Sequence, residues 1–171
     1  VAEVFGPVHD NKSMSTATDW ETAGGGSYYA VGVGGTLVGL GADILIIDDP
    51  VAGRQSAESE ADRTAVEEWY KGTARNRLQP GGAIVIIMTR WAPHDLVGTR
   101  LTEDPDGWDV LKMPAISDDN EALWPEMWPM EELEALKVDS GAFEWSALFQ
   151  QEPVIRGGNI IKTEFVRIHE D

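Results

Sequence analysis

Two runs of consecutive apolar residues interrupt an otherwise mixed pattern of hydrophobic and polar positions. They cover Ile44–Ile47 and Ala83–Met88, and most of their side chains are β-branched. Continuous apolar runs of this length are typical of strands buried on both faces in a parallel sheet. Aromatic and β-branched residues predict another strand over Ser27–Val33, and a short one is expected near Val4-Phe5.

The segment between the two apolar runs has helical spacing. Apolar residues recur three and four positions apart from Ala61 to Leu78. The helix is expected to begin near Ser56 or Ser59, with an N-capping arrangement at Ser59, and to run to Leu78, where Pro80-Gly81-Gly82 stops it. Strand, helix and strand of these lengths predict a βαβ unit, so the two strands should be parallel and adjacent.

Shorter elements are predicted in the second half of the chain. We expect a short helix over Pro93–Leu101 with Pro93 near its first turn, and a strand over Trp108–Met113. Two amphipathic helices should follow at Met130–Lys137 and Ala142–Gln151, with Gly141 between them. Five aromatic residues of this half are interpreted as core rather than as a stacking platform for bases: Trp124, Trp128, Phe143, Trp145 and Phe149.

Polar residues follow both apolar runs directly. Asp48 and Asp49 end the first run, and Thr89 and Arg90 end the second. Because the carboxyl ends of parallel strands meet at one edge of the sheet, these side chains should lie close together, where open α/β sheets place their ligands. In P-loop NTPases an Asp at such a strand end holds Mg²⁺, and a second acid could activate water. A Thr and an Arg beside them could sense a γ-phosphate.

A structural interpretation of the same residues stays open. The first strand could simply end in an Asp-Pro turn. Thr89 would then cap its strand, and Arg90 would form an ion pair with Asp48 or Asp49.

The sequence lacks the loop that would cradle phosphates in a P-loop enzyme. That loop requires Gly-x-x-x-x-Gly-Lys followed by Ser or Thr. Gly34 and Gly39 have the right separation, but Leu40-Gly41 stands where the Lys and the hydroxyl residue belong. If the chain is a P-loop enzyme, we therefore expect it to be a portion that begins after the phosphate loop.

Composition and charge narrow the alternatives. The absence of Cys excludes disulfides and thiolate metal sites. The longest apolar runs are too short to cross a bilayer and nothing resembles a signal peptide, so a cytosolic protein is expected. A net charge of −17 is unusual for a DNA-binding surface. Either this part does not grip DNA, or the protein comes from a high-salt setting.

Nine stretches, taken in order, resemble the large terminase subunit of tailed phages, the ATPase–nuclease that packages DNA into proheads. The order and spacing of these stretches over nearly the whole chain make the resemblance specific. They are residues 29–35, 41–50, 57–59, 77–82, 88–91, 95–98, 111–116, 123–126 and 147–153.

The resemblance implies a P-loop NTPase-like (ASCE) α/β fold, a parallel sheet flanked by helices. Residues 1–152 would form the C-terminal part of the ATPase domain. Residues 153–171 would form a linker and the start of an RNase-H-like nuclease domain, whose metal ligands should lie beyond Asp171.

The resemblance also implies roles for individual residues, with ATP and Mg²⁺ as cofactors. Asp48 would be the Walker B ligand of Mg²⁺, and Asp48 and Asp49 together would face the nucleotide. Asp49 would be the catalytic carboxylate that activates water. Thr89, with Arg90 and Trp91, would form the coupling motif that passes the nucleotide state to the parts that move DNA.

The implied protein is a motor that works as a homo-oligomeric ring on the portal in the host cytoplasm. Its partners would be double-stranded DNA, the portal protein and the small terminase subunit, with no membrane. The full-length protein would hydrolyse ATP, whereas this portion alone would be inactive without its phosphate loop. Relatives often carry Arg at the position of Leu40, and Arg54 and Arg90 are the candidates to replace that Arg.

Two other classes remain open at this stage. A different P-loop ATPase, such as a helicase, would share the acidic strand end but would not explain the motifs at residues 124–126 and 150–153. A non-catalytic prophage remnant or structural α/β domain is favoured by Leu40 and by the missing phosphate loop.

Overall fold

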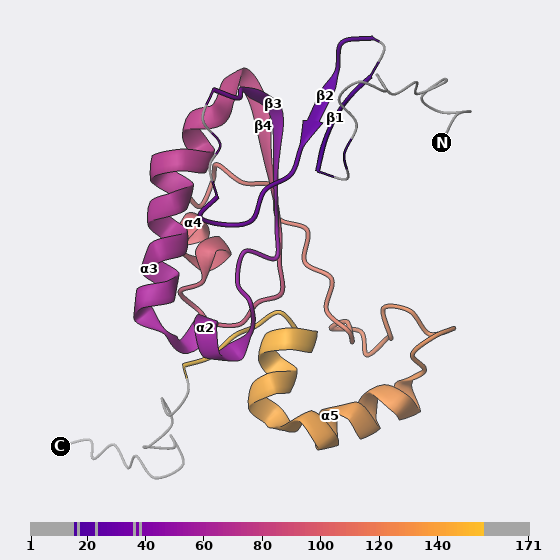
Figure 1. The fold of residues 1–171 in the computed structure, drawn as a ribbon. Coiled ribbons are helices and arrows are strands. Elements are labelled where there is room, and N and C mark those ends of the chain that lie inside the picture. Colours follow the sequence, from indigo (N-terminus) through magenta and orange to yellow (C-terminus); the bar gives the residue numbers. More distant parts are fainter. Residues whose placement is uncertain (1–15, 17, 23, 36, 38, 156–171) are drawn as a thin grey trace, which may run out of the picture.

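A computed structural model describes residues 16, 18–22, 24–35, 37 and 39–155 of the chain. The strand expected near Val4-Phe5, most of the linker and the segment from Ile160 onward lie outside these residues. Within them the protein is a mixed α/β structure with a small parallel sheet and helices (Figure 1).

The parallel sheet consists of strands β3 (Ala42–Asp48) and β4 (Leu78–Ile87). The pairing register runs from Ile44 opposite Ala83 to Asp48 opposite Ile87. The predicted pair of adjacent, parallel strands around a helical connection is therefore confirmed. A separate antiparallel hairpin joins β1 (Asp19–Glu21) to β2 (Ser27–Tyr29), so the strand predicted over Ser27–Val33 is shorter than expected.

A helical connection joins the two strands, and from Glu60 to Arg77 it is continuous, which confirms the helix predicted from near Ser59 to Leu78. Its parts are α2 (Arg54–Glu58), α3 (Glu60–Trp69), a π-helical turn η1 (Tyr70–Ala74) and a 3₁₀ turn η2 (Arg75–Arg77). The capping role predicted for Ser59 is confirmed, because its Oγ accepts a hydrogen bond of 3.2 Å from the backbone N–H of Asp62.

The helix ends at Arg77, one residue before the predicted end at Leu78, but the stop signal predicted at Pro80-Gly81-Gly82 is wrong, because these three residues belong to β4. The helical conformation ends earlier, at the tight η2 turn, and Leu78 is already extended. Gly81 has a φ of 82°, and a Cβ on Gly82 would lie 2.8 Å from the carbonyl oxygen of Asp43. The glycines therefore let β4 begin close against β3 at an irregular point of the register.

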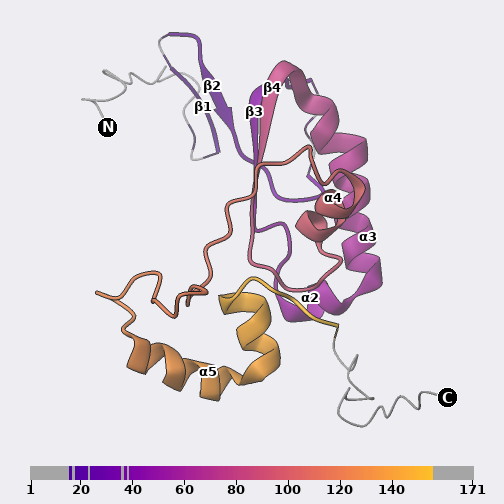
Figure 2. The ribbon, with the colours of Figure 1, turned by 180° about the vertical axis from the view of Figure 1, so that it is seen from behind.

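One face of the sheet packs against α3 and α4 (Leu96–Glu103), as Figures 1 and 2 show from opposite sides. The core of this region contains Ile47, Val66, Tyr70 and Leu96, with partly buried residues of both strands against it. We refer to these packed elements as the sheet lobe.

The prediction that both faces of the strands are buried is wrong for the described residues. Ile44 and Ile46 are 65% and 59% exposed, and Val85 and Ile87 are 42% and 54% exposed on the same face. An apolar run shows that each residue would tolerate burial, but it does not determine whether another element covers that face.

The second half of the chain builds its own small core. Helix α5 (Met130–Glu144) is kinked at Gly141, whose φ is 75°, and a π-helical turn η3 (Trp145–Phe149) follows. The predicted break at Gly141 is thus confirmed. Buried Ile116, Leu133 and Trp145 form the core, and the ring of Phe149 stacks on that of Trp145. We refer to this part as the α5 lobe.

Three predictions for this half are wrong. The segment Trp108–Met113 forms no strand. Trp124 and Trp128 are 56% and 43% exposed, so they are not core residues in the described structure. Pro93 precedes helix α4 instead of occupying its first turn, because the side chain of Asp95 caps that helix.

Within the part of the chain that the structure describes, no helix combines the length and the apolarity needed to span a bilayer.

Candidate functional site

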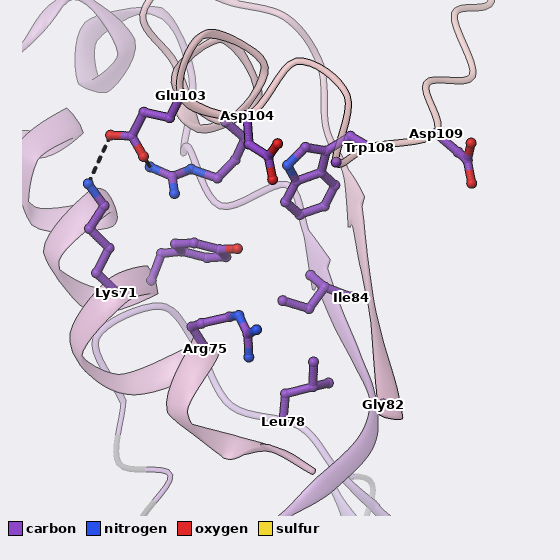
Figure 3. A pocket seen from close by; sticks show the side chains of 12 residues that line it. Lys71, Arg75, Leu78, Gly82, Ile84, Glu103, Asp104, Trp108 and Asp109 are labelled. Carbon is purple, nitrogen blue, oxygen red and sulfur yellow. Dashed lines mark hydrogen bonds and ion pairs between the residues drawn. The ribbon is translucent and has the colours of Figure 1, made fainter. Parts of the chain in front are cut away.

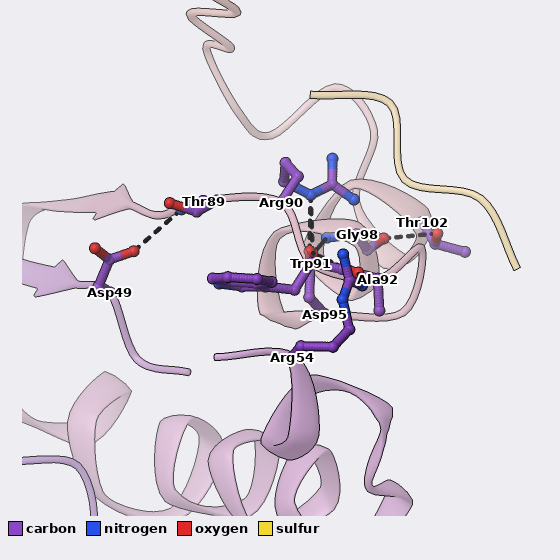
Figure 4. Close-up of polar contacts among 9 residues, drawn as sticks. All are labelled: Asp49, Arg54, Thr89, Arg90, Trp91, Ala92, Asp95, Gly98 and Thr102. Carbon is purple, nitrogen blue, oxygen red and sulfur yellow. Dashed lines mark hydrogen bonds and ion pairs between the residues drawn. The ribbon is translucent and has the colours of Figure 1, made fainter. Parts of the chain in front are cut away.

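The carboxyl ends of β3 and β4 bring Asp49 and Thr89 together, as the topology predicts. The backbone N–H of Asp49 donates to the carbonyl of Ile87 at 2.9 Å. In return, the backbone N–H of Thr89 donates to Oδ1 of Asp49 at 3.1 Å (Figure 4). The two hydrogen bonds join the ends of both strands. A movement of the loop after β3 would therefore displace the loop after β4.

The backbone of Asp49 is held in an unusual conformation. Its φ is 40°, one of three positive values among the described non-glycine residues. Such angles cost free energy for residues with a Cβ, but Asp and Asn tolerate them better than most. Strain of this kind clusters at ligand sites, where the surrounding structure fixes a side chain in place.

Asp48 offers an open carboxylate beside this pair. The residue is exposed and lies opposite Ile87 in the register. Its carboxylate has no hydrogen-bond or ion-pair partner among the described residues. The described part of the chain contains no group of three or more His, Cys, Asp or Glu side chains that could hold a metal. One or two carboxylates, completed by water and phosphate oxygens, are nevertheless the set that Mg²⁺ commonly takes in phosphoryl-transfer sites.

Arg90 does not join the strand-edge carboxylates. Its Nε donates to both oxygens of Asp95, at 3.0 and 2.9 Å. The side chain of Asp95 is fully buried, and its Oδ1 also accepts from the backbone N–H of Gly98 at 2.9 Å. The structural interpretation that paired Arg90 with Asp48 or Asp49 is therefore wrong, because a helix cap nearby provides its partner.

Gly98 is part of the same tight turn. A Cβ at this position would lie 1.9 Å from the carbonyl oxygen of Pro93, so only glycine fits without a shift of the backbone. Sequence reasoning did not assign a capping role to Asp95, although an Asp directly before the apolar pair Leu96-Val97 is a recognisable N-cap signal.

Arg54 is also engaged. Its guanidinium forms an ion pair with Glu144 and donates to the carbonyl oxygen of Trp91. Both arginines that could replace a cation at Leu40 thus have anionic partners in this conformation. Arg90 uses only its Nε for Asp95, whereas Arg54 uses both terminal nitrogens for Glu144 and the Trp91 carbonyl.

A separate cavity of about 570 Å³ lies at the opposite end of the strands (Figure 3). Lys71 donates to Glu103 at 3.0 Å and pairs with Glu67 at 2.9 Å on one side of it. These hydrogen bonds raise the pKa of Lys71, and the bond from Lys71 lowers the pKa of Glu103. Since Leu78 and Gly82 line the cavity, it is remote from Asp48 and Asp49.

The lowered pKa of Glu103 predicts a small loss of stability in acid. A carboxylate whose folded pKa is depressed stabilises the protein above its ordinary value of 4.5, and that contribution disappears as the pH falls through the folded pKa. We expect Glu103→Gln to lose less stability than the wild type between about pH 6 and pH 3. Urea denaturation at both pH values measures this, and equal losses in the two proteins would contradict it.

No protein-family model matches the chain, and no curated protein matches it significantly. The fold and the site thus define only a broad class: a mixed α/β protein whose parallel strands end in a polar edge.

Proposed function

We propose that this chain is part of a phage terminase large subunit, an ATP-driven motor that moves double-stranded DNA into the prohead. The observation that carries the proposal is the juxtaposition of Asp49 and Thr89 at the carboxyl edge of a parallel sheet, with the carboxylate of Asp48 open beside them. Open α/β sheets bind their ligands at this edge. In the proposed fold the sheet is the P-loop NTPase-like (ASCE) one.

Each acid would have a different task at the proposed site. Bound Mg²⁺ would neutralise charge on the phosphates of ATP. Asp48 would hold the ion, because its carboxylate has no partner among the described residues. Asp49 would orient and deprotonate the attacking water through Oδ2, since Oδ1 is occupied by Thr89. The same hydrogen bond would report the state of the site to the Thr89-Arg90-Trp91 segment.

The exposed apolar face of the sheet supports this interpretation. Four large β-branched side chains point away from α3 and are at least 42% exposed. A two-stranded sheet with one open apolar face is marginal by itself, so further elements are expected to pack there. In the proposed motor these elements would be helices of the ATPase domain, because helices cover the faces of parallel sheets.

The partners follow from the proposed motor. It would form a homo-oligomeric ring on the portal protein in the host cytoplasm, with the small terminase subunit and double-stranded DNA as further partners. Because the chain carries a net charge of −17, the contacts to the phosphates of DNA would come from other parts of the motor. A nuclease domain that begins near residue 153 would cut the DNA.

A non-catalytic α/β domain is the second candidate. The ion pairs of Arg54 and Arg90 favour it, because they leave neither candidate cation unpaired in the described conformation. In this case Asp49 and Thr89 would only fasten the ends of two strands.

ATP hydrolysis separates the two candidates. If the chain is part of such a motor, we expect a longer protein that includes the phosphate loop to hydrolyse ATP, with stimulation by double-stranded DNA, and the 171-residue chain alone to show no turnover. Phosphate release with and without Mg²⁺ and DNA measures both. If the longer protein neither binds nor hydrolyses ATP, the motor proposal is wrong and the non-catalytic domain is favoured.

A further inference from the structure

The sheet lobe and the α5 lobe have separate hydrophobic cores. The core of the first contains Ile47 and Val66, and the core of the second contains Leu133 and Trp145, with no residue in common. Two small cores without shared residues can move relative to one another unless specific contacts hold them. The contacts that cross between them therefore decide how the lobes are coupled.

One such contact is centred on Arg54. Its guanidinium carbon lies 5.2 Å from the ring centre of Trp91 and 4.8 Å from that of Phe143. The same group donates to the carbonyl of Trp91 and pairs with Glu144. Arg54 begins α2, which leads into α3, and Trp91 lies between β4 and α4, so both belong to segments that connect elements of the sheet lobe. Phe143 and Glu144 end helix α5, so the single side chain of Arg54 contacts both lobes.

The chemistry of this contact requires arginine. A planar guanidinium can lie against aromatic faces and still donate hydrogen bonds at its edge. An ammonium group has no such plane, so a lysine at this position would lose part of the contact while keeping the charge. The side chain of Arg54 is 19% exposed and that of Glu144 is 31% exposed, so the pair is partly shielded from solvent.

The position of Arg54 along the chain ties this contact to the candidate site. Arg54 follows Asp49 by five residues, and Trp91 follows Thr89 by two. Figure 4 shows Arg54 and Trp91 beside one another: Arg54 begins α2, directly after the loop that leaves β3, and Trp91 lies in the loop that leaves β4. A change in either loop would thus reach the guanidinium, and through it the end of α5.

We infer that Arg54 is a positioning residue that fixes the α5 lobe to the two loops of the strand edge. Its mechanistic part rests on the proposed function: in a working ATPase, Arg54 would pass movements of the Asp49 and Thr89 loops to α5. It touches no reacting group in this role. The structural part, the coupling of two lobes, does not depend on ATP.

The structural part can be tested with paired spin labels. The chain contains no cysteine, so Glu68→Cys in α3 and Asp139→Cys in α5 accept labels selectively. Both residues are exposed. We expect a narrow distance distribution in the labelled parent and a clearly broader one after Arg54→Lys, Arg54→Ala or Glu144→Gln. Glu152→Gln is the matched control, because it removes the exposed Lys112–Glu152 ion pair and leaves Arg54 untouched.

The mechanistic part is tested in the longer protein. We expect Arg54→Lys to keep KM for ATP within about twofold and to reduce the stimulation of kcat by DNA about tenfold, because a positioning residue acts on a step after binding. Amide exchange of the sheet lobe should be unchanged in Arg54→Lys, which separates lost coupling from unfolding.

The outcomes are distinguishable. If the distance distribution of Arg54→Lys and Glu144→Gln equals that of the parent, Arg54 does not couple the lobes, whatever the activity. If the distribution broadens but DNA stimulation is unchanged, the mechanistic part is wrong. If the parent longer protein binds no ATP, the proposed function fails, and the spin-label result still decides whether Arg54 joins the lobes.

Discussion

Asp95→Ala is expected to lower the free energy of unfolding by about 3 kcal/mol. The carboxylate of Asp95 is fully buried and accepts hydrogen bonds from Nε of Arg90 and from the backbone N–H of Gly98. Its removal leaves the Arg90 cation without a counter-charge and helix α4 without its cap. The expected loss lies at the lower end of the range for buried pairs, because Arg90 retains 18% of its side-chain exposure.

Urea denaturation with an unchanged m-value measures this loss. Asp95→Asn should be intermediate, because the amide oxygen can still cap α4 while the charge is gone. Asp118→Ala is the control, because this carboxylate is exposed and has no hydrogen bond or ion pair with the described residues. Its removal should change stability by less than about 0.5 kcal/mol. A loss below about 1 kcal/mol for Asp95→Ala would show that the Arg90–Asp95 pair contributes little net stability.

The parallel pairing of β3 and β4 could be predicted because it depends on local information. The two apolar runs, the helical spacing between them and the handedness of βαβ connections leave few arrangements. The exposure of Ile46 and Val85 could not be predicted in the same way. Whether a sheet face is buried depends on the elements that pack against it, and no pattern within the two apolar runs specifies those elements.

The candidate site shows the same division. Topology alone was enough to place Asp49 beside Thr89, because parallel strands end at one edge. It was not enough to choose a partner for Arg90, because several carboxylates follow or flank the strand ends. The buried cap of α4 takes Arg90, since Asp95 is held in place by the Gly98 N–H and is shielded from water. Local helix geometry therefore decided a contact that strand topology left open.

In the proposed ATPase, Asp49→Asn is expected to reduce kcat for ATP about 10²-fold or more, while nucleotide binding is retained. Asparagine keeps an oxygen that can accept the hydrogen bond from the Thr89 N–H, and it tolerates the φ of 40° at this position. The substitution therefore removes the charge and the basicity of Asp49 with little change in structure. A loss of turnover would then report on chemistry and not on folding.

Two further variants make this result specific. Asp48→Asn should weaken Mg²⁺-dependent nucleotide binding, because it removes the carboxylate proposed to hold the ion. Asp43→Asn is the matched control, since Asp43 is an exposed acid at the other end of β3.

Steady-state phosphate release and titration with a fluorescent ATP analogue separate kcat from binding. Ordinary turnover by Asp49→Asn would remove Asp49 from the catalytic role, and equal losses in Asp49→Asn and Asp43→Asn would point to a general effect of charge. Only a loss confined to the strand edge would support the assignment, because Asp43 and Asp49 are both exposed carboxylates and differ in which end of β3 they occupy.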